Sequence, residues 1–223
     1  MNNLPLVSCI MPTYNRHKYM LRAIKYFECQ TYGNKELIII DDSPRNMDIK
    51  LGSIPKHNNI LYIKLPSKRS IGFKRNLALR YAKGTIFMFW DDDDYYSKTR
   101  IAHQIKPIVN NLCDITVFNS IVYYDSLLNK CFKTSAADHK RIWHDGHMGG
   151  SLTCISSLLN KISFKNKSIA EDRDFMIDAK KHGAIIKGIP NNWHYIYTRH
   201  SSNSFDIPLV KRYDVPFKQH LSL

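Results

Sequence analysis

The sequence predicts an α/β fold, in which a mostly parallel central sheet is flanked by helices and extended by antiparallel strands in the second half. In the first half, apolar runs of strand length alternate with segments of helical periodicity, which is typical of crossover units. Three of these runs are continuously apolar, as in parallel strands that are covered on both faces. Polar clusters follow the runs, so we expect a binding site at the carboxyl ends of the strands.

The first half contains four predicted strands and two predicted helices. The strands span residues 6–11, 37–40, 60–65 and 85–90. The helix over 16–30 has one apolar face, which is formed by Tyr19, Met20, Ala23, Ile24 and Phe27. The helix over 71–82 precedes Lys83 and Gly84, and glycine suits a helix C-cap at this place.

The second half begins with an amphipathic helix over 97–110. A hairpin is predicted next, with strands over 115–124 and 130–134 and a turn over 125–129. A polar loop over 138–150 follows, and a loop of this length in a compact domain is more often functional than idle. The remaining elements are a helix over 172–182, a strand over 184–189 and a basic, aromatic tail over 203–223.

Length and composition indicate one domain, because 223 residues with 43% hydrophobic content can form a single core and no Gly/Ser-rich or Pro-rich linker divides them. The formal charge of +14 favours anionic partners or a well-solvated surface, and net charge does not separate the two. Five scattered cysteines indicate reduced thiols in a cytoplasmic protein. The N-terminus is a poor signal peptide and no apolar stretch reaches the roughly 20 residues that span a bilayer, so we expect a soluble chain with at most peripheral membrane contact.

The densest charge in the chain is the run Asp91 to Asp94, which follows the predicted strand over 85–90 directly. Four adjacent carboxyl groups beside a buried strand cannot all ionise without a cation or several hydrogen-bond donors. Mg²⁺ and Mn²⁺ bind carboxylate oxygens and often share their coordination with phosphate oxygens. The run therefore predicts a divalent metal and a phosphate ligand at the same place.

Two other polar clusters follow predicted strands, namely residues 12–16 and residues 41–43. In open α/β sheets the carboxyl ends of the strands form the ligand crevice, so these clusters are expected to meet the aspartate run.

Four motifs stand in order along the chain: residues 7–16 (VSCIMPTYNR), residues 36–43 (ELIIIDDS), Lys74-Arg75-Asn76 and Asp91–Asp94. Together they resemble family 2 glycosyltransferases of the GT-A fold over about the first 105 residues, and the resemblance resumes at residues 170–175 and 197–200. The resemblance implies a Rossmann-like sheet in a single GT-A domain over 1–223. Within it, residues 1–105 would form the nucleotide-binding half, 106–202 the acceptor-binding half, and 203–223 a basic tail or lid.

The resemblance implies that Pro12, Thr13, Tyr14 and Arg16 lie along the nucleotide sugar, with Tyr14 near the base. Asp42 resembles the acid that accepts a hydrogen bond from uracil N3–H, which favours UDP as the carrier. The alternative is that Asp41 and Asp42 only begin a turn.

Arg75 matches a basic residue that contacts the nucleotide at the start of a helix. A cation there opposes the helix dipole, and a bound diphosphate would relieve that conflict.

In the aspartate run, Asp93 corresponds to the principal metal ligand and Asp91 to a residue that contacts metal or ribose. Asp92 occupies the variable position of the D-x-D-D motif, and we expect it to contact the nucleotide sugar. Asp94 either supports the ligands or caps the helix over 97–110. The alternative for the whole run is an exposed acidic turn.

Asp172, in the pair Glu171-Asp172, matches the general base of the family, and the alternative is N-terminal capping of a helix. His200 is expected to ligate the metal and Arg199 to pair with phosphate, or both are ordinary surface residues. His139, His144 and His147 fit no zinc pattern and are expected to contact the acceptor or to have no role.

The resulting hypothesis is an inverting transferase, dependent on Mn²⁺ or Mg²⁺, that moves a hexose from a UDP-sugar to a hydroxyl of a glycan, glycolipid or protein. Clustered carboxylates and a basic surface would also serve a metal-dependent nucleotidyltransferase or nuclease, although no nucleic-acid module is recognisable and no nucleic acid is expected as a partner. A third possibility is a module that binds nucleotide sugar or glycan without turnover. The sequence does not indicate which sugar is donated, which acceptor is used or what the oligomeric state is.

Overall fold

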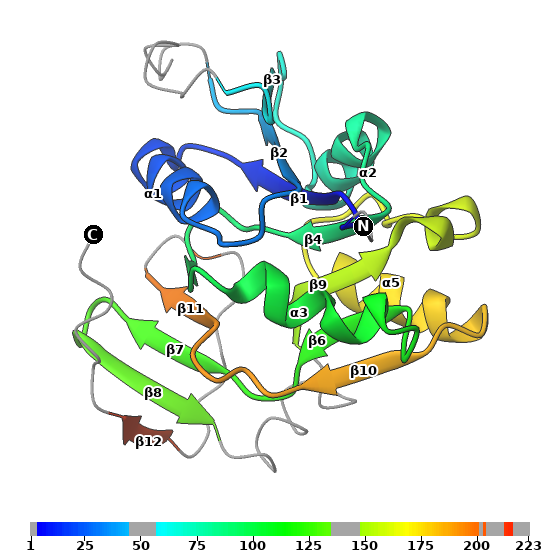
Figure 1. The fold of residues 1–223 in the computed structure, drawn as a ribbon. Helices are drawn as coiled ribbons and strands as arrows, with labels where there is room; N and C mark the ends of the chain where they lie inside the picture. Colours follow the sequence, from blue (N-terminus) through cyan, green and yellow to red (C-terminus); the bar gives the residue numbers. More distant parts are fainter. Residues whose placement is uncertain (1–3, 45–56, 135–147, 201–202, 204–211, 216–223) are drawn as a thin grey trace.

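The computed structural model describes residues 4–44, 57–134, 148–200, 203 and 212–215 of the chain, and these form two β-sheets with helices packed against the larger one (Figure 1). The larger sheet has seven strands in the order β10-β6-β9-β4-β1-β2-β3. These strands are β1 Val7–Thr13, β2 Lys35–Asp41, β3 Ile60–Lys64, β4 Ile86–Phe89, β6 Ile115–Phe118, β9 Met148–Ile155 and β10 Ile186–Ile189. The predicted α/β class with a mostly parallel sheet is confirmed.

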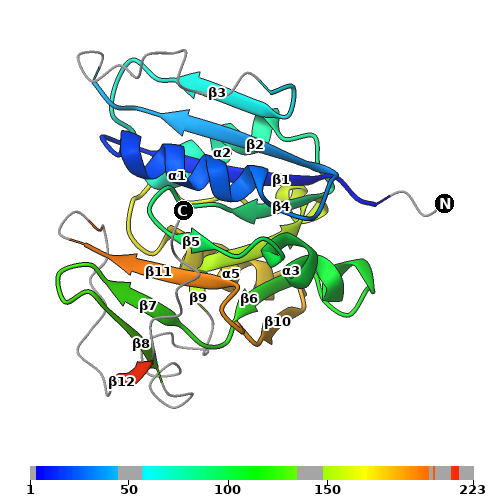
Figure 2. The ribbon, with the colours of Figure 1, turned by 60° about the vertical axis from the view of Figure 1, so that its left-hand side comes forward.

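Both faces of this sheet are covered, which explains the continuously apolar strands. Helices α1 His17–Glu28 and α3 Arg100–Val109 pack on one face, with Cys9 and Met88 from the sheet. Helices α2 Ile71–Tyr81 and α5 Glu171–Lys181 pack on the other face, with Ile10 and Phe87. The two helix layers are visible on either side of the strands in Figures 1 and 2. Alternate residues of one strand thus enter two separate cores.

The second sheet has five strands in the order β12-β8-β7-β11-β5 and is the predicted antiparallel extension, with one parallel pair. Its strands are β5 Tyr95–Tyr96, β7 Val122–Asp125, β8 Lys130–Thr134, β11 Tyr195–Arg199 and β12 Arg212–Val215. The hairpin is confirmed by antiparallel pairing of Tyr123 with Phe132. Because β7 and β11 run parallel, the turn after β7 lies beside the end of β11 (Figure 2).

Two predictions about the second half of the chain were wrong. The predicted strand over 115–124 is two strands, because the chain leaves the large sheet after Phe118 and enters the second sheet at Val122. Residues 148–150 of the predicted loop begin β9, which lies between β4 and β6 and runs antiparallel to both. The rest of that loop lies outside the described residues.

Gly84 is not the C-cap of α2, since the helix ends at Tyr81 and Ala82 is already extended. A Cβ on Gly84 would lie 2.5 Å from the carbonyl oxygen of Leu6, so the residue is glycine because β1 passes close to it.

In the part of the chain that is described, none of the helices combines the length and apolar character needed to span a bilayer.

A close backbone contact at the start of α2 predicts that Gly72→Ala destabilises the protein by about 1–3 kcal/mol. The added Cβ would lie 1.9 Å from the carbonyl oxygen of Lys165, and the amide of Gly72 already donates to Lys167 O at 3.0 Å. Urea unfolding monitored by circular dichroism gives the change. Gly33→Ala is the control, because its Cβ would meet nothing within 4 Å. Equal stability of the two variants would contradict the packing described here.

Candidate active site

A cavity of about 630 Å³ opens beyond the carboxyl ends of β1 and β4, as the sequence predicts. Its acidic part is formed by the aspartate run and by Glu171 and Asp172. Its remaining walls come from α2, the start of β9, the segment before α5, and β11. The lining residues are Pro12, Arg16, Ile71, Arg75, Asp91–Asp94, Met148–Gly150, Ser168–Arg173, Met176, Ile177, Tyr195, Tyr197 and Asn203.

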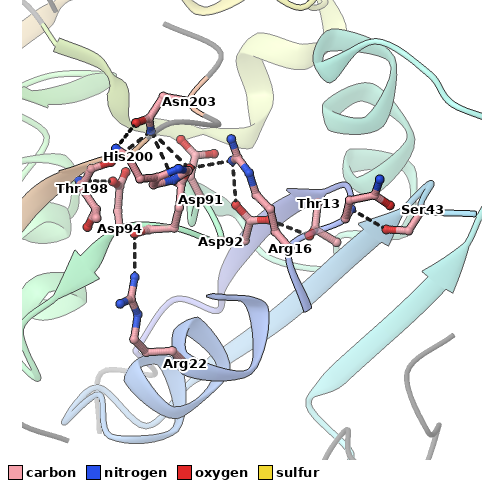
Figure 3. Close-up of polar contacts among 12 residues, drawn as sticks. Thr13, Arg16, Arg22, Ser43, Asp91, Asp92, Asp94, Thr198, His200 and Asn203 are labelled. Atoms are coloured by element: carbon pink, nitrogen blue, oxygen red, sulfur yellow. Dashed lines mark hydrogen bonds and ion pairs between the residues drawn. The ribbon is translucent and has the colours of Figure 1, made fainter. Parts of the chain in front are cut away.

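The aspartates of the run have different partners (Figure 3). Asp92 is 1% exposed and accepts hydrogen bonds from Thr13 Oγ1 at 2.6 Å and from Arg16 Nη1 at 3.2 Å. Asp93 Oδ2 lies 2.6 Å from the same Arg16 nitrogen and 3.1 Å from His200 Nε2. Arg16 therefore bridges two adjacent carboxylates, and Asp92 fixes the loop after β1 to the loop after β4.

Asp94 connects the run to the second sheet. Tyr195 Oη donates to its Oδ2 at 2.5 Å, and the amide of Thr198 donates to its Oδ1 at 2.8 Å. The alternative of a helix cap is wrong, because α3 begins at Arg100 and its N-cap is Thr99. Asp94 instead holds β11 against the aspartate run.

Burial changes the acidity of these groups. It raises the pKa of Asp92 from 3.8 to about 7, an effect increased by the charge of Asp93 and opposed by Arg16. Burial also raises the pKa of Asp91, against the attraction of Arg75, and the pKa of Asp94. The cluster thus keeps protons that free carboxyl groups would lose, unless a further cation enters the cavity.

Arg75 is a buried cation between two acids. Its Nη2 lies 3.4 Å from Asp91 Oδ1, its Nε lies 3.3 Å from Glu171 Oε1, and its guanidinium carbon lies 3.3 Å from the centre of the Phe89 ring. Within the described part of the chain, Nη1 has no hydrogen-bond partner, and Nε has only the ion pair with Glu171. Buried donors without a partner are costly, and an anionic ligand in the cavity would satisfy them.

Asp172 stands at the start of α5, directly above β9. Its Oδ1 accepts from the amide of Arg173 at 2.7 Å. Its Oδ2 lies over Gly149, where an added Cβ would approach it to 2.1 Å. The preceding Ala170 has a left-handed φ of 58°, which turns the chain sharply into the helix. Glycine at 149 is therefore required for the carboxylate of Asp172 to take this position.

The predicted metal ligands are of the chemical types that bind a divalent cation. Asp93 Oδ2 and His200 Nε2 are 3.1 Å apart, and Asp91 and Asp93 both line the cavity. Carboxylate and imidazole together suit Mn²⁺, whereas carboxylates alone suit Mg²⁺. Among the described residues, no three His, Cys, Asp or Glu side chains converge closely enough to hold a metal ion. The charge of Asp93 is instead neutralised by the guanidinium of Arg16.

Five predicted residues are not among those that line the cavity, namely Thr13, Tyr14, Asp42, Arg199 and His200. Asp42 is buried, with Lys74 Nζ at 2.8 Å and the amide of Arg69 at 2.6 Å from its carboxylate oxygens. Lys68 Nζ lies over the ring of Tyr14, 4.3 Å from the ring centre. Arg199 lies 3.7 Å from Asp125 on β7. Pro12, Arg16, Arg75, Asp91, Asp92, Asp93 and Asp172 do line the cavity.

Sequence reasoning missed four residues that shape the site, Arg22, Gly149, Tyr195 and Asn203. Arg22 Nη2 donates to the carbonyl of Asp93 at 2.8 Å, and Asn203 Nδ2 donates to Thr198 O at 3.0 Å (Figure 3). Only the pair Gly149-Gly150 gave a signal, as two small residues inside a loop that was expected to be functional. His139, His144 and His147 lie outside the described residues, as does most of the tail over 203–223.

Several known proteins resemble this chain in sequence. A family model described as Glycosyl transferase family 2 matches residues 8–169. The UDP-Glc:alpha-D-GlcNAc-diphosphoundecaprenol beta-1,3-glucosyltransferase WfgD of Escherichia coli is 30% identical over 163 residues, which are 71% of this chain and 64% of the relative. The chain spans 44%, 52% and 64% of the length of three such relatives.

Two solved structures share the fold. TarS 1-349 of S. aureus in complex with UDP-GlcNAc matches with a TM-score of 0.69 at 22% identity, over 89% of this chain and 60% of TarS. Mannosyltransferase PcManGT from Pyrobaculum calidifontis, in complex with GDP-Man and Mn²⁺, matches with a TM-score of 0.66 at 15% identity, over 89% of this chain and 57% of the other. At these identities the likeness concerns the fold alone, and it confirms the predicted GT-A fold.

The raised pKa of Asp92 predicts how stability depends on pH in a chelating buffer. Between pH 4 and 7 the native carboxyl group keeps a proton that the unfolded chain has lost, so the free energy of unfolding falls as the pH rises through this range. Asp92→Asn removes this titration and flattens the slope. Chemical unfolding at several pH values measures the difference between the two proteins. A slope that is unchanged in the variant would contradict the raised pKa.

Proposed function

The chain belongs to glycosyl transferase family 2, and we propose that it transfers a hexose from a UDP-sugar to a hydroxyl group of a glycan, glycolipid or protein acceptor. The observation that carries the proposal is one cavity that combines a buried arginine with free donors, an aspartate run and a separate carboxylate, Asp172. These groups match the three needs of the reaction: a diphosphate site, charge neutralisation and a base.

UDP is the proposed carrier. WfgD is named for UDP-Glc, and the TarS structure contains UDP-GlcNAc, whereas the PcManGT structure contains GDP-Man. Arg75 would donate its Nη1 hydrogens, which have no hydrogen-bond partner among the described residues, to phosphate oxygens. Asp42 stays the proposed acceptor for uracil N3–H, and because its carboxylate is enclosed by Lys74 and the amide of Arg69, the uracil would have to replace one of these donors.

Asp93, Asp91 and His200 would hold the divalent cation, and Arg16 would then share Asp93 with it or move away. When bound, the cation would neutralise charge on the departing diphosphate.

Asp172 is the proposed general base. Its carboxylate takes the proton of the acceptor hydroxyl while that oxygen forms a bond to the anomeric carbon. The bond from the anomeric carbon to the phosphate oxygen breaks, and UDP leaves with the electron pair. Attack on the face opposite the leaving group inverts the anomeric configuration in one displacement.

Incubation with UDP-glucose, UDP-galactose and their N-acetyl forms, with Mn²⁺ and candidate saccharide acceptors, tests this function. We expect release of UDP that depends on the acceptor, and a product with the opposite anomeric configuration by NMR. If no sugar nucleotide is turned over but a nucleoside triphosphate or a nucleic acid is, the chain is a nucleotidyltransferase or nuclease. Binding of a UDP-sugar without any turnover would identify a non-catalytic module.

Asp172→Asn is expected to lower kcat by about 10²–10⁴-fold, because the amide cannot take the acceptor proton. UDP affinity stays unchanged, since Asp172 is not a proposed donor ligand. Gly149→Ala is expected to lower kcat in the same direction, because its Cβ displaces the Asp172 carboxylate. Steady-state kinetics and UDP titration measure both variants. Full transfer by Asp172→Asn would rule out its role as the base.

Asp93→Ala is expected to weaken UDP binding in the presence of Mn²⁺ by about tenfold or more, with little change in the presence of EDTA. Isothermal titration with and without Mn²⁺ measures the difference. Asp178→Ala is the matched control, because this aspartate pairs with Lys165 and Lys181 on the outer surface of α5. Equal Mn²⁺-dependent binding by the Asp93→Ala variant and the control would exclude Asp93 as a ligand.

A further inference from the structure

We propose that Arg16 exchanges between two anions. In this structure it neutralises Asp92 and Asp93, and it transfers to the diphosphate of the donor when a divalent cation takes its place on Asp93. Arg16 thus makes the binding of the metal and the binding of the nucleotide depend on one another. The inference rests on the proposed function and adds a coupling between the two parts of its donor site.

Arg16 occupies the place at the aspartate run that a divalent cation would need. Its Nη1 lies 2.6 Å from Asp93 Oδ2 and 3.2 Å from Asp92 Oδ1 (Figure 3). His200 Nε2 contacts the same Asp93 oxygen at 3.1 Å. Since Mg²⁺ binds carboxylate oxygens at about 2.0–2.1 Å, an ion on Asp93 Oδ2 and the guanidinium would lie within about 5 Å of each other. Two cations this close repel one another in a buried site, so exchange is favoured over sharing.

The backbone beside Arg16 is fixed, whereas its side chain can turn. The amide of Asn15, a residue with a left-handed φ of 54°, donates to Ser43 Oγ at 2.7 Å. The amide of Ser43 in turn donates to Asp41 Oδ1 at 2.8 Å, at the end of β2. The side chain of Arg16 is 19% exposed and lines the cavity. Rotation about its side-chain torsions can therefore move the guanidinium while the Cα atom stays in place.

Arg75 marks the part of the cavity to which the guanidinium can transfer. Both arginines line the same cavity, and Nη1 of Arg75 has no hydrogen-bond partner among the described residues. A diphosphate held by Arg75 presents further oxygens, and arginine binds phosphate oxygens through paired donors.

The nucleotide determines whether the exchange is favourable. Without a diphosphate, Arg16 would leave the aspartate run and become a cation with no anion to replace the two carboxylates. With UDP present, the guanidinium exchanges one anion for another. The metal therefore binds weakly alone and tightly with UDP, and linkage requires that it raises the affinity for UDP by the same factor.

Titration of Mn²⁺ without nucleotide, and of UDP with Mn²⁺ at saturation, tests the exchange. Arg16→Gln is expected to bind Mn²⁺ alone about tenfold or more tightly than the unmodified chain, because no guanidinium has to leave Asp93. The same variant is expected to bind UDP about tenfold or more weakly, since the diphosphate loses a charged donor. The two changes have opposite signs, whereas a damaged site would lose affinity for both ligands.

Arg173→Gln is the matched control, because it removes the same charge from the wall of the same cavity. The side chain of Arg173 is 55% exposed and pairs loosely with Asp174, at 4.0 Å. Its removal is expected to change either affinity by less than about threefold. Arg16→Lys keeps the charge without the paired donors, and it is expected to give smaller changes in the same directions as Arg16→Gln. Thermal unfolding in EDTA checks that each variant is folded.

Unchanged or weaker binding of Mn²⁺ by Arg16→Gln would overturn the proposal, since Arg16 would then be a fixed part of the aspartate run. Tighter binding of Mn²⁺ with unchanged binding of UDP would exclude the transfer to the diphosphate and overturn it as well. An equal gain in Mn²⁺ affinity by Arg173→Gln would do the same, because the net charge of the cavity would explain the effect.

If Arg16→Gln does not fold, Arg16→Lys takes its place, and binding of both ligands equal to that of the unmodified chain would count against the exchange. Failure of the proposed function is seen separately, as absence of UDP-sugar turnover with every acceptor, while the binding of Mn²⁺ can still respond to Arg16.

Discussion

The placing of a buried acidic run at the end of a central strand is the constraint on which the site depends. Asp92 and Asp94 are each 1% exposed, so their charges can be tolerated only with hydrogen bonds, counterions or retained protons. The chain supplies these from several directions. Arg16 comes from the loop after β1, the Thr13 hydroxyl from the end of β1 and Tyr195 from β11.

This constraint explains why the second sheet is attached where it is. β11 is fixed to the aspartate run by the Tyr195 hydroxyl and the Thr198 amide, both on Asp94. The same strand then delivers His200 to Asp93, where the imidazole stacks on Tyr19 of α1 with ring centres 4.9 Å apart. Asp94, which takes no part in the proposed chemistry, thus positions His200, a proposed metal ligand.

The first half of the fold could be predicted because its signals are local. Continuous apolar strands, amphipathic helices and polar strand ends each lie within a few consecutive residues, and their convergence follows from the rule for parallel sheets. The second half could not be predicted to the same extent. β9 has no distinctive period, and its place between β4 and β6 depends on long-range pairing, such as Met88 with Thr153. The choice of partner for Asp94 depends on tertiary contacts in the same way, which is why a local cap was an equally good interpretation.

The insertion of β9 also determines how the proposed base, Asp172, and the acidic run approach one another. The strand begins with Met148, Gly149 and Gly150, at the cavity. A Cβ on Gly149 would collide with the carboxylate of Asp172, and a Cβ on Gly150 would lie 3.9 Å from Asp91 Oδ2. Gly149 therefore leaves space for the Asp172 carboxylate, whereas a Cβ on Gly150 would make only ordinary van der Waals contact. A larger side chain at 149 would displace the carboxylate of the proposed base, so the size of this residue is part of the proposed chemistry.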